Sequence, residues 1–242
     1  MSAYELKNKT VLVVGGSAGI GLEVARIAVE LGANVHIASR GKTKVNQPLS
    51  QATYHECDAK SEVSLAALFS KLNRVDHVAM TVHESAARLG IDTTAEKMNL
   101  SAAMEYADGK FWSQYRVVKA ALPHLAPDGS ITLSSGVASR ATMANHSAIS
   151  AVNASIEACA RQLAKELAPR RMNVVAPGVT ATTTYDAMPA DAREQFVQRI
   201  AAVVPLKRIA RAEEIALAYV FAMQCGYLTG TVLDPSGGQL VA

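Results

Sequence analysis

The stretch Val11–Gly21, which reads VLVVGGSAGIG, decides the fold of this chain. A run of mostly β-branched residues from Thr10 to Val14 predicts a buried strand, and the run stops at two glycines. Apolar residues then recur at helical spacing from Ile20 to Leu31, which predicts a helix directly after the turn. Glycines allow a positive φ and let the backbone approach a pyrophosphate, whose charge suits a helix N-terminus.

A second predicted strand, Ala33–Ala38, follows at the distance that a dinucleotide site requires. Strand, glycine turn, helix and strand together favour such a site over a purely structural turn. Strands and helices alternate along the rest of the chain, which predicts an α/β fold with a doubly wound parallel sheet of about seven strands. The further strands are expected at Ala52–Cys57, Asp76–Val82, Gly129–Ser134, Met172–Ala176 and Thr231–Leu233. A helical stretch is expected from about Thr94 to Leu125, with an interruption near Asp108-Gly109.

The composition excludes several classes of protein. The 242 residues are 50% hydrophobic, which is enough for one well-filled core, so a single domain over residues 1–242 is predicted. A net charge of +3 with interspersed acids and bases argues against a nucleic-acid or membrane surface. No apolar run of about 18 residues and no apolar leader occurs, so we expect a cytoplasmic protein. The three cysteines are too widely spaced for a disulfide framework or a metal site.

The second strand ends at Ser39-Arg40, where dinucleotide sites distinguish their cofactors. An acidic residue at this point binds a ribose 2′-hydroxyl, whereas a basic residue accepts a 2′-phosphate. Ser39, Arg40 and Lys42 offer a hydroxyl and two cations, so NADP(H) is favoured over NAD, with a solvated basic loop as the alternative. Asp58, after the third strand, is a candidate partner for the adenine amino group or a helix cap.

With these features the chain resembles the short-chain dehydrogenase/reductase family over essentially its whole length. Residues Gly15–Gly21 are similar to the family's glycine loop, and Asp58 matches its aspartate after the third strand. The resemblance implies a Rossmann fold, a small-molecule substrate and a homodimer or homotetramer. Further segments close to the family pattern are Ala164–Pro169, Asn173–Gly178, Pro205–Ile215 and Tyr227–Thr231 with Gly237-Gly238.

The resemblance also implies contacts to the cofactor. The glycine loop is expected at the phosphates, Asn153 at a ribose hydroxyl, and Val179 at the carboxamide of the nicotinamide. The alternative is that these loops serve the fold alone and bind no cofactor. Residues 182–204, which contain a helical patch, are predicted to form a mobile flap over the substrate. The cofactor contacts expected from the loops are Gly15, Ser17, Gly19, Ile20, Gly21, Pro177, Gly178, Val179 and Thr182.

The catalytic pattern departs from the family, which uses Asn, Ser, Tyr and Lys. Counting back along the long helix from Glu166–Pro169 places Ile149 at the Tyr position and Asn153 at the Lys position. The serine is retained as Ser135, and Lys110 takes the Asn position. Isoleucine cannot transfer a proton, and asparagine supplies no charge to lower a neighbouring pKa. Carbonyl reduction by the family's tyrosine route is therefore not expected.

Two further features concern the same site. Met80–His83 replaces the family's Asn-Asn-Ala-Gly, and Val14 replaces the Thr that usually bonds it, which indicates a site rebuilt as a unit. A second alignment matches His146–Ser150 to the family's Tyr-Ser-Ala-Ser-Lys and places His146 at the Tyr position. It needs a shift at the helix start, and Ala154–Glu157 supports the first alignment.

Several side chains are candidates to replace the tyrosine. Lys110, if desolvated, has a lowered pKa and acts as an acid or an electrostatic clamp, and the alternative is a solvated lysine at a helix start. His146 is a candidate proton donor or an exposed loop histidine. Tyr115 is more typical of packing, Tyr185 lies on the predicted flap, and His83 fills space in the crevice.

Three functions fit this sequence. The first is an NADP(H)-dependent oxidoreductase with a non-standard proton donor, acting on an activated C=C, C=N or C=O group. Hydride transfer depends mainly on orientation, so such a substrate needs no strong acid nearby. The second is a catalytically silent NADP(H)-binding protein. The third is a non-redox lyase on the same fold, and the intact glycine loop counts against it.

Overall fold

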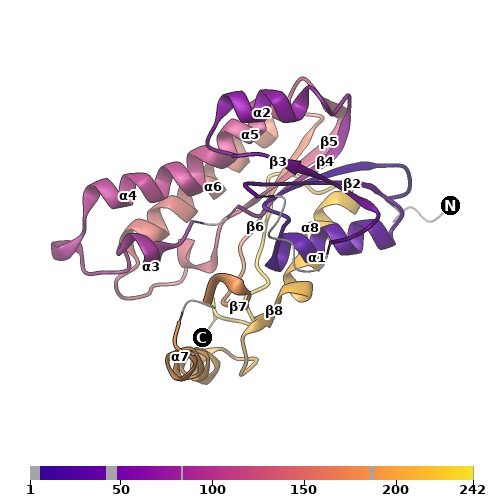
Figure 1. Cartoon of the computed structure of the whole chain (residues 1–242). Coiled ribbons are helices and arrows are strands. Elements are labelled where there is room, and N and C mark those ends of the chain that lie inside the picture. Colours follow the sequence, from indigo (N-terminus) through magenta and orange to yellow (C-terminus); the bar gives the residue numbers. More distant parts are fainter. Residues whose placement is uncertain (1–5, 42–47, 83, 186–187, 242) are drawn as a thin grey trace.

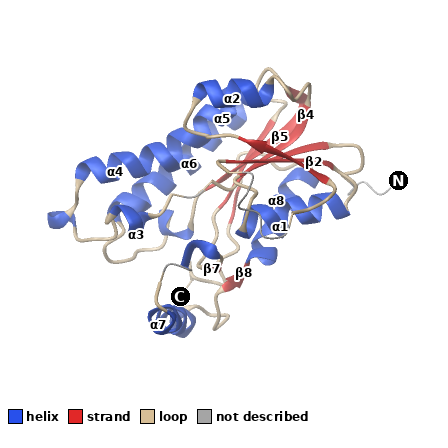
Figure 2. Cartoon of the chain, in the orientation of Figure 1, coloured by secondary structure: helices blue, strands red, loops and turns tan. Residues whose placement is uncertain are grey.

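The computed structural model describes residues 6–41, 48–82, 84–185 and 188–241. A parallel sheet forms its centre (Figures 1 and 2). Its strands are β1 (Thr10–Val14), β2 (Asn34–Ser39), β3 (Ala52–Glu56), β4 (Val75–Met80), β5 (Leu125–Ser134), β6 (Arg171–Val175) and β9 (Val232–Leu233). The order is β3-β2-β1-β4-β5-β6-β9, and every neighbouring pair is parallel. The predicted sheet of about seven strands is confirmed.

Helices cover both faces of this sheet (Figure 1). The α-helices of the described residues are α1 (Gly19–Glu30), α2 (Glu62–Phe69), α3 (Ala86–Leu89), α4 (Leu100–Ala107), α5 (Ser113–Ala121), α6 (Ser147–Glu166), α7 (Ala190–Val203) and α8 (Ala212–Gln224). On one face, α1 and α8 share a core with β1 and β2 that includes Val24 and Ile215. On the other face, α2, α5 and α6 form a second core that includes Leu65, Val117 and Ile156.

The strand order positions the site. Strands β4 and β6 are buried along their whole length, which is typical of a parallel sheet covered on both faces. The order reverses between β1 and β4, and in open parallel sheets the crevice at the carboxyl ends of such strands receives the ligand. The glycine turn follows β1 at this crevice.

Two predicted boundaries are wrong. The helix expected to begin near Thr94 begins at Leu100, because the Asn99 side chain caps it by accepting a hydrogen bond from a main-chain N–H at 3.2 Å. Strand β5 begins at Leu125 rather than at Gly129, because its ladder to β4 continues on both sides of a β-bulge. The interruption predicted near Asp108-Gly109 is confirmed as a π-turn, η3 (Asp108–Trp112), between α4 and α5.

The helical patch predicted within residues 182–204 is α7. It follows a short strand, β7 (Thr180–Ala181), which pairs with β8 (Ala210–Arg211) in a separate two-stranded sheet. Figure 1 shows α7, β7 and β8 gathered at one end of the molecule, away from the main sheet. A role for this segment as a mobile flap stays a prediction.

No helix among the residues that the structure describes is long and apolar enough to cross a membrane.

Arg171 is buried at the start of β6 and holds the end of α8. Its Nη1 donates to the carbonyls of Ala222, Cys225 and Leu228 at 2.7, 3.0 and 3.2 Å, and its Nη2 donates to that of Met223 at 2.8 Å. The last carbonyls of a helix have no donor within the helix. The guanidinium therefore supplies donors to the carbonyls at the end of α8, whereas the Leu228 carbonyl has a second donor in Asn173 Nδ2 at 2.9 Å.

We expect Arg171→Met to lower the free energy of unfolding by about 3 kcal/mol, because several buried carbonyls lose their donor. Urea unfolding followed by circular dichroism measures this loss. The matched control is Arg161→Met at an exposed position of α6, with an expected change below about 0.5 kcal/mol. Similar losses in the two variants would contradict this role of Arg171.

Candidate active site

A cavity of about 1010 Å³ opens at the carboxyl ends of the central strands. Its walls include the segments that follow strands β1 to β6, together with α6 and η3. The structure brings the following cofactor and catalytic candidates together on these walls. They are Gly15, Ser17, Gly19, Ile20, Gly21, Ser39, Arg40, Asp58, Lys110, Ser135, His146, Ile149, Asn153, Pro177, Gly178, Val179 and Thr182.

The glycine turn presents its backbone to the cavity. Gly15 and Gly19 have φ values of +93° and +54°, which side-chain-bearing residues rarely adopt. Ala18, the N-cap of α1, makes no side-chain hydrogen bond to the first turn of the helix. The first N–H groups of α1 therefore remain available to a ligand, and together with the helix dipole they suit a diphosphate.

Thr81 ties this turn to the end of β4. Its hydroxyl and its N–H both donate to the carbonyl of Val14, at 3.1 and 2.9 Å. Because the acceptor is a main-chain oxygen, Val14 needs no polar side chain at this position. The two departures noted in the sequence are thus linked by direct contact. His83 lies outside the described residues.

The far end of the cavity carries the residues expected at the adenosine. Ser39 and Arg40 lie at the end of β2, and Arg40 is exposed. Lys42 lies outside the described residues. Asp58 Oδ1 accepts a hydrogen bond from the Lys60 N–H at 2.9 Å, so Asp58 stabilises the turn before α2 and also lines the cavity.

Helix α6 presents Ile149 and Asn153 to the cavity, one helical turn apart. Asn153 is 3% exposed, and its Oδ1 accepts no hydrogen bond from the part of the chain that the structure describes. A buried amide oxygen without a donor costs free energy, so a bound hydroxyl would be stabilised at this point. The glycine turn and this oxygen together fit a dinucleotide with a ribose hydroxyl at Asn153.

Ser135 lines the cavity, but its hydroxyl is directed elsewhere. Oγ donates to Glu157 Oε1 at 2.9 Å, in the interior beneath α6. This geometry differs from the expectation that the hydroxyl polarises a substrate carbonyl. A Cβ on the neighbouring Gly136 would approach Asn153 Nδ2 to 3.1 Å. A side chain at residue 136, rather than at residue 135, would therefore face Asn153.

Lys110 lies in the middle of the π-turn and is 6% exposed. Its Nζ donates to the Ser135 carbonyl at 3.0 Å, and the described carboxylates form no ion pair with it. Burial lowers the pKa of Lys110 to about 8. The alternative of a solvated lysine at a helix start is wrong, because the irregular turn directs this side chain inward.

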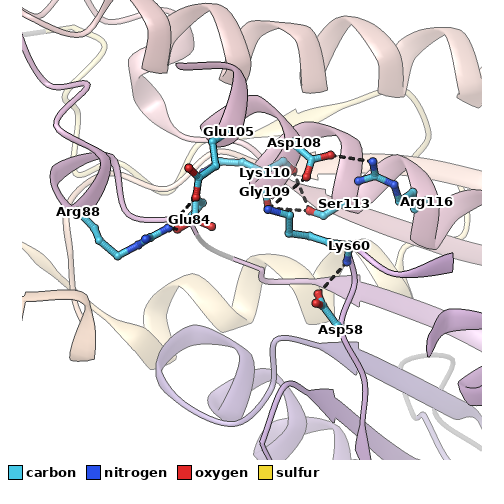
Figure 3. A network of polar contacts seen from close by, with 10 residues as sticks. All are labelled: Asp58, Lys60, Glu84, Arg88, Glu105, Asp108, Gly109, Lys110, Ser113 and Arg116. Atoms are coloured by element: carbon cyan, nitrogen blue, oxygen red, sulfur yellow. Dashed lines mark hydrogen bonds and ion pairs between the residues drawn. The ribbon is translucent and has the colours of Figure 1, made fainter. Parts of the chain in front are cut away.

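Polar side chains hold the π-turn in place (Figure 3). Ser113 Oγ donates to the Gly109 carbonyl at 2.8 Å, and Gln114 Nε2 donates to the Lys110 carbonyl at 2.9 Å. Asp108 pairs with Arg116 Nη2 at 2.7 Å. These contacts satisfy main-chain carbonyls in the irregular turn, and single π-turns are often found at functional sites.

Sequence analysis missed Glu84, a buried carboxylate that lines the cavity after β4 (Figure 3). Its Oε1 accepts hydrogen bonds from Arg88 Nη2 at 2.9 Å and from the Ser85 N–H at 3.1 Å. Burial acts to raise the pKa of Glu84, but these hydrogen bonds hold it below its ordinary value. Glu84 also requires Gly109, because a Cβ there would lie 2.8 Å from Oε2. A charged residue directly after an apolar strand was the available signal.

The other candidate proton donors, His146, Tyr185 and Tyr115, lie at different places relative to the cavity. His146 precedes α6 and lines the cavity, with Nδ1 2.6 Å from the Ala144 carbonyl. Tyr185 lines the cavity, and burial raises its pKa. Tyr115 is 38% exposed and packs against the ring of Trp112. No group of three or more metal-binding side chains occurs in the described ranges.

A family model described as Enoyl-(Acyl carrier protein) reductase matches residues 14–239. A short-chain dehydrogenase/reductase of Acremonium sp is 29% identical, and the match covers 100% of this chain and 98% of that protein. Another, from Stachybotrys chlorohalonatus, is 30% identical over 96% of this chain and 97% of that protein.

Solved structures agree with these matches. A small-chain dehydrogenase in complex with NADPH has a TM-score of 0.84 and 34% identity, covering 98% of this chain and 100% of that chain. The MalC reductase/Diels-Alderase of Malbranchea aurantiaca has a TM-score of 0.88 and 25% identity, covering 100% of both chains.

We expect Gly21→Ala to weaken dinucleotide binding about 100-fold, because the added methyl group would collide with Thr81 Oγ1 and lie 2.6 Å from the Gly15 carbonyl. Calorimetric titration with NADPH measures the effect. Gly226→Ala is the control, since a Cβ there meets nothing within 4 Å. Unchanged binding in Gly21→Ala would remove the glycine turn from the nucleotide site.

Proposed function

The chain belongs to the short-chain dehydrogenase/reductase family, and we propose that it is an NADP(H)-dependent reductase in which Lys110 replaces the family's tyrosine. The observation that carries this proposal is a buried ammonium group in the wall of the cavity that Ile149 also lines. The proposed substrate is a small molecule with an activated C=C, C=N or C=O bond.

The chain's own residues would hold the cofactor at three places. The N–H groups at the start of α1 bind the diphosphate, Asn153 Oδ1 accepts from a ribose hydroxyl, and Arg40 pairs with the 2′-phosphate. When bound, NADPH supplies hydride to the substrate. The relative solved with NADPH supports this choice of cofactor.

Lys110 supplies the proton in this proposal. With a pKa of about 8, the side chain is mostly protonated at pH 7 and gives up its proton more readily than an ordinary lysine. Its ammonium also stabilises negative charge that develops on a substrate atom, and this effect is strong where water is excluded. The Ser135 carbonyl holds one N–H, which leaves the other N–H groups for the substrate.

The cavity walls favour an apolar substrate. Ala138, Met143, Ile149 and Tyr185 line the part of the cavity near α6 and the predicted flap. Relatives described as reductases, including the one from Malbranchea, support reduction rather than non-redox chemistry. Site geometry also favours a second candidate, a catalytically silent NADP(H)-binding protein. The Ser135 hydroxyl is bound to Glu157, and the Ile149 side chain has no proton that it could transfer to a substrate.

Assembly and location belong to the same proposal. Helix α4 and the π-turn after it expose Leu100, Met104 and Trp112, which are 69%, 72% and 49% accessible. A second copy of the chain would cover such an apolar patch. We therefore include a cytoplasmic homodimer or homotetramer in the proposed function.

Lys110→Met is expected to lower kcat/KM for NADPH-dependent reduction about 100-fold, because it removes the proton donor. The binding constant for NADPH should stay within about 3-fold of wild type, since the proposed cofactor contacts are elsewhere. NADPH oxidation with a panel of an imine, an enone and a quinone measures turnover. Lys119→Met, at an exposed position of α5, is the matched control.

Absence of NADPH oxidation by the wild-type protein across this panel, with NADPH binding intact, would favour the silent binding protein. Full activity of Lys110→Met would remove Lys110 from the reaction.

Arg40→Ala is expected to raise the dissociation constant for NADPH about 10-fold and to leave that for NADH unchanged, because only NADPH carries the 2′-phosphate. Fluorescence titration of the two nucleotides measures both constants. Equal weakening for NADPH and NADH would show that Arg40 does not distinguish them.

A further inference from the structure

Glu157 is a buried carboxylate in the middle of α6 that the proposed chemistry does not use. It is 5% exposed. Oε1 accepts hydrogen bonds from Ser135 Oγ at 2.9 Å and from Ser139 Oγ at 2.5 Å, and Oε2 lies 3.2 Å from Arg140 Nε. A buried charge costs free energy unless it is paired and hydrogen-bonded, and this one is both.

The contacts of Glu157 extend beyond α6. Arg140 also pairs with Asp234, with Nη1 2.7 Å from Oδ2. Glu157 therefore joins α6, the segment after β5 and the segment after β9. Removal of this carboxylate would break its three contacts with the segment after β5, which are those to Ser135, Ser139 and Arg140.

Ser135 connects this network to Lys110. Its hydroxyl donates to Glu157, its carbonyl accepts from Lys110 Nζ at 3.0 Å, and its N–H donates to the Val175 carbonyl at 3.0 Å. The hydroxyl and the carbonyl belong to one residue, so the bond to Glu157 limits where the carbonyl points. The direction of that carbonyl in turn fixes the ammonium group.

We infer that Glu157 is a positioning residue for Lys110: it holds Ser135 so that the Ser135 carbonyl keeps Nζ at one place in the cavity wall. The inference rests on the proposed function only for its consequence on turnover. The position of Nζ itself is a property of the folded chain and is measurable without a substrate.

Glu84 from the segment after β4 and Asp108 from the π-turn are drawn beside Lys110 in Figure 3, and Glu157 from α6 bonds the same Ser135 that holds Lys110. Glu84 is paired with Arg88, Asp108 with Arg116, and Glu157 with Arg140. Burial, rather than a neighbouring charge, lowers the pKa of Lys110. If the Ser135 carbonyl moves, Nζ turns toward cavity water, and its pKa rises toward that of an ordinary lysine.

Two serine variants test this link. Ser135→Ala and Ser139→Ala each remove one hydroxyl that bonds Glu157 Oε1, but only Ser135 carries the carbonyl that holds Lys110. The readout is the pH titration of the Lys110 13Cε resonance in protein labelled with 13C-lysine, assigned with Lys110→Met. Ser135→Ala should raise the pKa of Lys110 by about one unit, and Ser139→Ala by less than about 0.3.

Variants of Glu157 complete the test. Glu157→Leu should raise the pKa of Lys110 by about one unit, whereas Glu157→Gln, whose amide oxygen still accepts from both serines, should stay within about 0.5 of wild type. Glu166→Gln, at an exposed position of the same helix, is the matched control. Thermal unfolding and NADPH binding establish that each variant is folded.

An unchanged or lowered pKa of Lys110 in folded Ser135→Ala would overturn the inference, as would equal shifts in the two serine variants. These outcomes do not depend on turnover, so they are distinguishable from failure of the proposed reductase. If the reductase is correct, Ser135→Ala also loses about 10-fold in kcat, with KM changed less, because the proton donor is misplaced.

Discussion

The hydrogen bond from Lys110 Nζ to the Ser135 carbonyl is the contact on which this account of the site depends. It joins the π-turn to the end of β5, and both segments line the cavity. Gln114 reinforces the junction by donating to the Lys110 and Ser134 carbonyls and by accepting from the Ser134 N–H. A lysine ammonium is thereby kept out of bulk water, and no carboxylate of the described residues pairs with it, which is an arrangement that favours proton donation.

The two halves of the cavity differ in how closely their residues match the family's sequence pattern. The half around the glycine turn keeps the residues that the family resemblance implies, and Asn153 Oδ1 adds an acceptor that lacks a donor. In the other half, Ile149 stands where the resemblance places the family's tyrosine, and the Ser135 hydroxyl bonds Glu157 instead of facing the cavity. These two features are the basis on which we propose a different proton donor.

Local patterns were sufficient to predict the parallel sheet, the glycine turn and the interruption at Asp108-Gly109, because strand periodicity and turn residues are encoded within short windows. The direction of the Ser135 hydroxyl was not predictable, since it depends on Glu157, which is 22 residues away on another element. Glu84 was missed for a similar reason: its pair with Arg88 is local, but its burial arises where the segment after β4 meets Gly109 of the π-turn. The direction of a side chain at a site depends on tertiary contacts, and a local sequence pattern carries no information about them.

The pH dependence of NADPH-driven reduction is the most direct test of the claim that Lys110 donates the proton. The group is active when protonated, so the account predicts that kcat is constant at low pH and falls as pH rises through the pKa of Lys110, about 8. In Lys110→Arg, whose guanidinium keeps its proton, this fall near pH 8 should disappear. A wild-type rate that shows no change near pH 8, or the same fall in Lys110→Arg, would contradict the account.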